Sequence, residues 1–104
     1  MSAVQTLTID PPPPDIPTLT SPIDDAILRR SPILRWKRVS GGVMYELQIS
    51  TSSDFSSPTT YTVRTNNRRL PALPEGVYYW RVRVKDGVGN WSDWSSYRTF
   101  ETHR

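Results

Sequence analysis

The 104-residue chain contains no cysteine and only one histidine. Without cysteine it can form no disulfide, no thiolate metal site and no cysteine nucleophile. The single histidine, His103, is the penultimate residue, where we expect no fixed site. A nucleophile and its base would have to come from lysine or carboxylate groups. We therefore predict that the chain is not an enzyme and carries no catalytic, metal or cofactor site.

Long apolar runs are also missing. No segment near Met1 has the apolar centre of a signal peptide, and no stretch is long enough to cross a bilayer. We therefore expect no direct membrane insertion. If the protein is exported, we expect its signal to lie in a longer parent chain. The absence of cysteine leaves the compartment open, because many extracellular β-sandwiches have none.

The net charge of +3 is not gathered on one expected face. Arg35 and Lys37 lie on one expected strand, and Arg81 and Arg83 lie on another that should belong to the opposite sheet. Two outward faces on opposite sides of a domain do not form the continuous basic stripe that follows a phosphate backbone. We predict no nucleic-acid partner.

Proline, glycine and aromatic residues are frequent. Ten prolines and five glycines interrupt the chain too often for long helices. Alternating apolar and polar positions instead predict short strands over residues 16–19, 33–38, 43–50, 59–64, 68–70, 77–84 and 97–102. This spacing and the length of the chain predict one all-β domain, a seven-stranded immunoglobulin-like β-sandwich.

The alternation is clearest in the expected strand 77–84. Its even-numbered residues, from Tyr78 to Val84, should point into the core, whereas Arg81 and Arg83 should point outward. A surface ion pair between Glu46 on the neighbouring strand and one of these arginines would help to align their side chains.

A tryptophan–serine repeat at residues 91–95, with the sequence WSDWS, follows this strand. Indole faces attract guanidinium groups. Strand residues two apart are separated by about 6.6 Å, roughly the room that one ring needs between two planar neighbours. Trp91 and Trp94 can face the same way in a polyproline II segment, which turns once in three residues. The predicted structural cation–π ladder comprises Arg81, Arg83, Trp91 and Trp94, with Ser92 and Ser95 as part of the motif.

These residues resemble those of two families. The string WSDWS matches the WSxWS signature of class I cytokine receptors, where it lies in the membrane-proximal fibronectin type III-like domain. The wider sequence is more similar to the fibronectin type III-like repeats of microbial surface and secreted proteins. The segments that carry this similarity are residues 17–22, 34–36, 45–51, 54–55, 76–83 and 85–92. They imply a fibronectin type III-like fold over about Ile16 to Thr102 and leave the ligand open.

The same resemblance implies a tyrosine corner, in which a tyrosine hydroxyl bonds to backbone upstream of it. We assign this role to Tyr78, which follows Pro74-Glu75-Gly76. Tyr79 remains an alternative, because the spacing from Gly76 is one residue shorter than in many animal members of the family.

The chain divides into a tail and a domain. We expect residues 1–15 to form an N-terminal tail and proline-rich linker, and residues 16–104 to form the fibronectin type III-like domain. Four consecutive prolines, Pro11 to Pro14, should make a stiff polyproline II spacer. Such a spacer is expected where modules are strung in tandem.

The expected loops are short. Asp24-Asp25 and the stretch Asp86 to Asn90 are typical of turns, because Asp accepts hydrogen bonds from local backbone and Gly permits tight reversal. Only the loop Thr51 to Pro58 is long, and we expect Phe55 to pack from it into the core.

We predict a non-enzymatic spacer or adhesion module of a larger extracellular or cell-surface protein. It should be a monomer as an isolated domain, with neighbouring domains of the same polypeptide as its partners. Short loops favour a spacer, because recognition usually uses long loops. One alternative is a binding module for a polysaccharide or protein ligand; its candidate face comprises the outward aromatics Tyr61, Tyr79 and Tyr97. The other is a cytokine-receptor-like ligand-binding domain, which the short loops and the missing cysteine-bearing companion domain disfavour.

Overall fold

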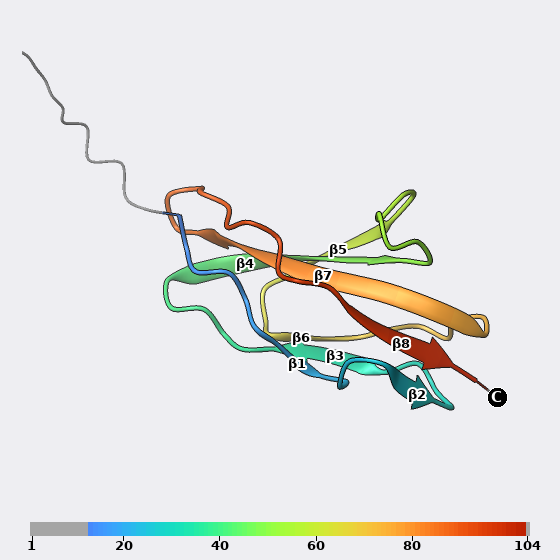
Figure 1. Cartoon of the computed structure of the whole chain (residues 1–104). Coiled ribbons are helices and arrows are strands. Elements are labelled where there is room, and N and C mark those ends of the chain that lie inside the picture. Colours follow the sequence, from blue (N-terminus) through green and yellow to red (C-terminus); the bar gives the residue numbers. More distant parts are fainter. Residues whose placement is uncertain (1–12, 104) are drawn as a thin grey trace, which may run out of the picture.

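The computed structural model describes residues 13–103. These residues form eight strands in two sheets (Figure 1). The strands are β1 (Leu19–Ser21), β2 (Ala26–Leu28), β3 (Ile33–Trp36), β4 (Gly42–Ser50), β5 (Thr59–Val63), β6 (Asn67–Arg69), β7 (Gly76–Asp86) and β8 (Arg98–Thr102). One sheet has the order β1-β3-β6 and the other has the order β2-β8-β7-β4-β5. The protein is therefore an all-β, immunoglobulin-like sandwich.

The core lies between the two sheets and is built from large side chains. Its largest fully buried members are Trp36, Trp80, Tyr45 and Phe100. The rings of Trp36 and Tyr45 lie 5.6 Å apart between centroids, and the Tyr45 hydroxyl accepts a hydrogen bond of 2.9 Å from the Val39 amide. Burying each such side chain contributes about 1.5–3 kcal/mol, so these rings are a major source of the stability of the domain.

Strand β7 is the centre of the larger sheet. Its even-numbered residues from Tyr78 to Val84 are buried, and the odd-numbered residues between them are half-buried on the outer face. β7 pairs with β4 over most of its length, whereas its pairing with β8 stops at Trp80 opposite Arg98. The second half of β7 therefore has no regular strand on its β8 side.

The prediction of seven strands missed β2. This strand pairs in parallel with β8, with Ala26 opposite Phe100. The turn at Asp24-Asp25 is present, and the Asp24 carboxylate and the Asp25 amide both bond to backbone of Thr99 (2.9 Å each). Three residues are too few to show alternation, and a parallel partner near the other end of the chain leaves no local signal.

Several predicted strand boundaries are also corrected; β3, for example, ends at Trp36 rather than at Arg38. β1 begins at Leu19 rather than Ile16, and Pro17, which lacks a backbone donor, lies before it. β8 begins at Arg98, one residue after Tyr97.

The chain enters and leaves the sandwich at opposite ends (Figure 1). Residues 13–15 lead in at one end, and β8 runs out at the other. Residues 1–12 of the predicted tail and linker, including Pro11 and Pro12, lie outside the described residues. No helix long and apolar enough to span a membrane occurs within residues 13–103.

Candidate functional site

The outer face of β7 carries a row of long side chains. Arg81, Arg83 and Lys85 alternate with buried residues, so all three project away from the core. Each is half-buried rather than free in solvent, because aromatic rings lie against it.

Indole rings lie between these cations. The guanidinium carbon of Arg83 is 4.3 Å from the ring centroid of Trp91 and 4.7 Å from that of Trp94. Arg81 lies 4.5 Å from the Trp94 ring, and the Lys85 ammonium lies 5.5 Å from the Trp91 ring. All four distances fall within the roughly 6 Å over which a cation is attracted to a ring face. Lys85 was not among the residues predicted for this ladder.

Phe55 extends the row. Its ring is buried, as predicted, but it packs on the outer face of the larger sheet rather than between the two sheets. Its ring is only 6% exposed, but it lies outside the core cluster and 4.1 Å from the guanidinium carbon of Arg81. A positive φ of 57° at Phe55 turns the loop back over the outer face of the sheet. Arg81 is therefore sandwiched between Phe55 and Trp94.

Two tyrosines continue the row beyond Phe55. The Tyr97 ring makes edge contacts with Phe55, at 6.0 Å, and with Tyr79, at 5.4 Å. We call the whole row the aromatic–cation strip. Its members, in order, are Tyr79, Tyr97, Phe55, Arg81, Trp94, Arg83, Trp91 and Lys85.

Strand β4 supplies polar partners for the two arginines. The Gln48 side-chain oxygen accepts hydrogen bonds of 3.0 and 2.8 Å from Arg81. Glu46 forms an ion pair of 2.6 Å with Arg83. Burial lowers the pKa of Arg81, and the nearby positive charge of Arg83 adds to this effect. Arg83 therefore has a counter-charge, whereas Arg81 is held by a neutral amide and two rings.

The serines of the repeat bond to the unpaired half of β7. The Ser92 amide donates to the Val84 carbonyl (2.8 Å), and its hydroxyl accepts from the Val84 amide (3.0 Å). Ser95 does the same at Val82, at 2.9 and 3.1 Å. Residues 92–95 thus satisfy backbone groups that a neighbouring strand would otherwise bond, and they hold both indoles over the arginines.

Tyr78 lies at the opposite end of β7. Its hydroxyl donates a 2.7 Å hydrogen bond to the Pro74 carbonyl, four residues upstream. The Thr102 hydroxyl donates to the same carbonyl at 2.8 Å, and the Tyr78 ring stacks on Phe100. Tyr78, rather than Tyr79, thus makes the bond to upstream backbone.

The three tyrosines of the candidate binding face do not share one face. Tyr61 lies opposite Leu47 in the β4–β5 register, so it points to the inner side of the sheet, where it packs at the margin of the core. Arg68 covers its ring at 4.5 Å. The position of Tyr61 two residues from buried Val63 is the sequence signal that indicates this orientation. Only Tyr79 and Tyr97 lie on the outer face.

Asp86 and Asp54 form hydrogen bonds within their own loops. The Asp86 carboxylate accepts hydrogen bonds from the amides of Val88 (3.1 Å) and Asn90 (2.9 Å). Asp54 accepts from the amide and hydroxyl of Ser56, and bonds from its serine neighbours lower the pKa of Asp54 to about 2. Within residues 13–103, no group of three or more His, Asp or Glu side chains is arranged to hold a metal ion.

The fold is that of an immunoglobulin-like domain. Residues 24–103 match the family of the Rha78A-like, N-terminal immunoglobulin domain, and the chain therefore belongs to this family. The family is an N-terminal module of rhamnosidase-like proteins and not their catalytic part.

Solved structures of two larger enzymes contain a similar domain. The α-L-rhamnosidase of Streptomyces avermitilis, solved with L-rhamnose, matches 86% of the chain at 25% identity with a TM-score of 0.62. The α-L-rhamnosidase from Dictyoglumus thermophilum matches 86% at 21% identity with a TM-score of 0.57, a likeness of fold alone. An uncharacterized protein of Treponema pallidum (strain Nichols) is 34% identical over 54% of the chain. The chain spans 10%, 12% and 9% of the lengths of these three proteins.

Proposed function

We propose that the chain is a non-catalytic spacer of fibronectin type III type within a longer carbohydrate-processing protein. The observation that carries this proposal is the path of the chain, which enters at one end of the sandwich and leaves at the other (Figure 1). A module with that path separates whatever lies on its two sides by its own length.

The aromatic–cation strip supports the proposal because it stiffens the region where regular pairing stops. β8 pairs with β7 only as far as Trp80, and Ser92 and Ser95 hold the remaining edge of β7. The strip then covers the outer face of the same strand. Side chains that are stacked and hydrogen-bonded on both sides resist bending of the sheet between them.

Two local features favour the fibronectin type III type among immunoglobulin-like sandwiches. One is the bond from Tyr78 to Pro74, expected of a tyrosine corner. The other is the WSDWS segment stacked on Arg81 and Arg83. We further propose a domain boundary near residue 16, a monomeric isolated domain, and a parent protein that acts at the cell surface or outside the cell.

Spin-label distance measurements test the spacer. Because the chain has no cysteine, labels can be placed uniquely through Asp15→Cys and His103→Cys at the two ends. We expect one narrow distance distribution, as narrow as that of a control pair, Thr62→Cys with His103→Cys, whose first label lies on β5. A distribution much broader than the control would contradict a rigid spacer.

A second candidate function is glycan binding beside Tyr97. The Tyr97 side chain is 48% exposed and borders a groove of about 570 Å³ between residues 16–19 and 95–98. An exposed ring beside polar groups can stack on a sugar. Titration with L-rhamnose and rhamnose-containing oligosaccharides, followed by tryptophan fluorescence, tests this function. Binding that Tyr97→Ala abolishes and Val88→Ala leaves unchanged would support it, and the absence of any binding would remove it.

A further inference from the structure

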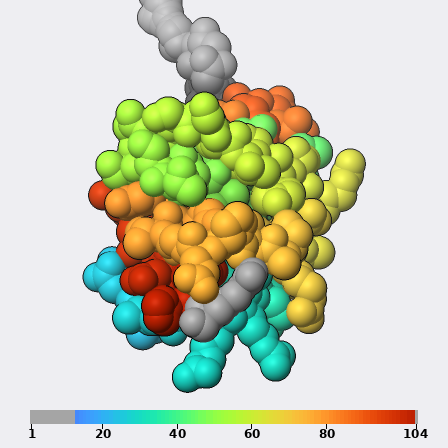
Figure 2. Space-filling model, turned by 90° about the vertical axis from the view of Figure 1, so that its right-hand side faces the viewer, coloured from blue at the N-terminus to red at the C-terminus, as the bar shows by residue number. Residues whose placement is uncertain are grey.

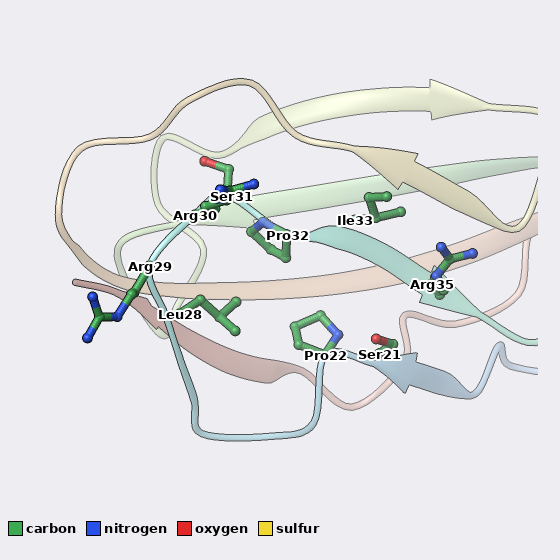
Figure 3. A pocket seen from close by; sticks show the side chains of 9 residues that line it. All are labelled: Ser21, Pro22, Leu28, Arg29, Arg30, Ser31, Pro32, Ile33 and Arg35. Atoms are coloured by element: carbon green, nitrogen blue, oxygen red, sulfur yellow. The ribbon is translucent and has the colours of Figure 1, made fainter. Parts of the chain in front are cut away.

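A second surface of the domain is lined by arginines without partners. A hollow of about 530 Å³ lies beside the segment that joins β2 to β3 (Figure 3). Pro22, Leu28 and Pro32 surround it, and Arg29 and Arg35 lie on either side. The hollow thus combines apolar walls with a cationic margin.

These arginines differ from those of the strip. The side chains of Arg29, Arg30 and Arg35 are exposed, and none makes a hydrogen bond, ion pair or ring contact with any of residues 13–103. No acidic side chain lines the hollow. Three exposed guanidinium groups beside an apolar hollow, without a counter-charge, are available to carboxylates from outside the domain.

The segment between β2 and β3 separates this hollow from another. A smaller hollow of about 230 Å³ also borders residues 29–31, together with Leu73 and Thr102. Residues 29–31 therefore stand as a ridge with a depression on each side. We call these residues, together with Arg35, the arginine ridge.

The end of β8 lies against the ridge. The His103 amide donates a 2.7 Å hydrogen bond to the carbonyl of Leu28, directly before Arg29. Figure 2 looks onto this end of the sandwich, and the turquoise segment around residue 30 projects at its lower edge near the red end of β8. Any polypeptide that continues beyond this point starts beside the arginine ridge.

We propose that the arginine ridge is the docking surface for the domain that follows in the same polypeptide. That domain would present carboxylates to Arg29, Arg30 and Arg35 and an apolar side chain to the hollow. Two observations select this occupant: the path of the chain past Leu28 and the uncompensated positive charge. The proposal rests on the proposed function, in which the chain is one module of a longer protein.

The chemistry of the hollow favours a protein surface over a glycan. Its apolar lining consists of proline and aliphatic side chains, and it has no aromatic ring on which a sugar could stack. Arginine around a desolvated apolar centre is instead typical of protein–protein contacts. Docking here would convert a tethered pair of domains into a pair with one fixed orientation.

Hydrogen exchange in the longer natural polypeptide tests the proposal. We expect the amides of Leu28 to Ile33 to exchange about tenfold more slowly there than in the isolated 104-residue chain, because docking suppresses local opening. Arg29→Glu/Arg30→Glu should abolish this difference. The matched control, Arg38→Glu/Arg64→Glu, changes the net charge equally at exposed positions outside both hollows and should preserve it.

The outcomes separate this inference from the proposed function. Equal exchange in the two polypeptides would overturn the docking surface and leave the spacer intact. Protection that survives the Arg29/Arg30 reversal would also overturn it, since the arginines would then not carry the contact. A coding region with no following domain would overturn both proposals. An unchanged melting temperature of the isolated double variant verifies that the substitutions leave the fold unharmed.

Discussion

The domain has two groups of arginines in different surroundings. Arg81 and Arg83 on β7 are stacked and hydrogen-bonded, whereas the arginines of the ridge are exposed. Arg81 lies between two rings and bonds to Gln48, and Arg83 lies between two indoles and pairs with Glu46. The arginine side chains of the ridge, Arg29, Arg30 and Arg35, are exposed and have no partner among residues 13–103.

The difference separates arginines that hold the domain together from arginines that are available to another molecule. A guanidinium group that is already stacked and hydrogen-bonded has little left to offer a ligand, and its removal exposes the aromatic rings that lie against it. A free guanidinium group contributes little to folding, because exposed charges are well solvated. Stability measurements should therefore separate the two groups.

The largest effect is expected at Phe55. Phe55→Ala removes a ring that is 6% exposed and covers Arg81, and it should lower the free energy of unfolding by about 1.5–3 kcal/mol. Urea denaturation measures this change. Val88→Ala, at a side chain that is 73% exposed, is the control. A loss as small as that of the control would mean that the outer face does not stabilise the fold.

The next effect is expected at Ser95. Ser95→Ala removes the hydroxyl that accepts from the buried Val82 amide, and leaving that amide unsatisfied should cost about 1–3 kcal/mol. Ser96→Ala, at the neighbouring exposed residue, should have almost no effect. Amide exchange at Val82, measured in both variants, should accelerate in the first alone. Equal exchange rates would show that the serine hydroxyl is dispensable.

Replacing a stacked arginine should have a somewhat smaller effect. Arg83→Ala should lower stability by about 1–2 kcal/mol, as for a partly desolvated cation–π contact. Arg83→Lys keeps the charge and loses the planar group, so it should recover part of the loss. If the midpoint of chemical denaturation is unchanged in Arg83→Ala, the stacked arginine does not contribute to stability.

Acidification should loosen the loop that carries Phe55. The folded-state pKa of Asp54 is lowered from 3.8 to about 2, so its contribution to stability is present above about pH 4 and is lost as the pH falls toward 2. The urea midpoint should therefore drop between pH 5 and pH 2.5 more in the native chain than in Asp54→Asn. Equal drops would exclude Asp54 as a source of this pH dependence.

The smallest effect is expected on the ridge. Arg35→Ala should change the stability of the isolated chain by less than about 0.5 kcal/mol, because the side chain is exposed and without a partner. Parallel denaturation of Arg35→Ala and Arg83→Ala gives the comparison directly. Similar losses in both variants would mean that stacking does not distinguish the two groups of arginines.

The sequence indicated that Arg81 and Arg83 stack on Trp91 and Trp94, because the strand and the tryptophan–serine repeat each have a local period. A strand places alternate residues on one side, and the indoles recur after three residues. Phe55 could not be assigned in the same way. It comes from a loop whose positive φ turns the ring toward Arg81, and no periodic pattern extends through that loop.

The arginine ridge was also invisible in the sequence. Arg29 and Arg30 were not singled out, and β2, which precedes them, was missed because its parallel partner β8 lies at the other end of the chain. The predicted outward orientation of Tyr61 was wrong, because the side of β5 that faces the core depends on its register with β4.

The alternation of apolar and polar residues by itself determined the all-β class and which residues of β7 point into the core. These follow from the two-residue period of a strand, which each segment carries within itself. The folded chain alone decided which loop covers Arg81, which strand lies beside β8 and which arginines are left without partners. Those outcomes depend on contacts between distant segments, and such contacts exist only after the two sheets have packed.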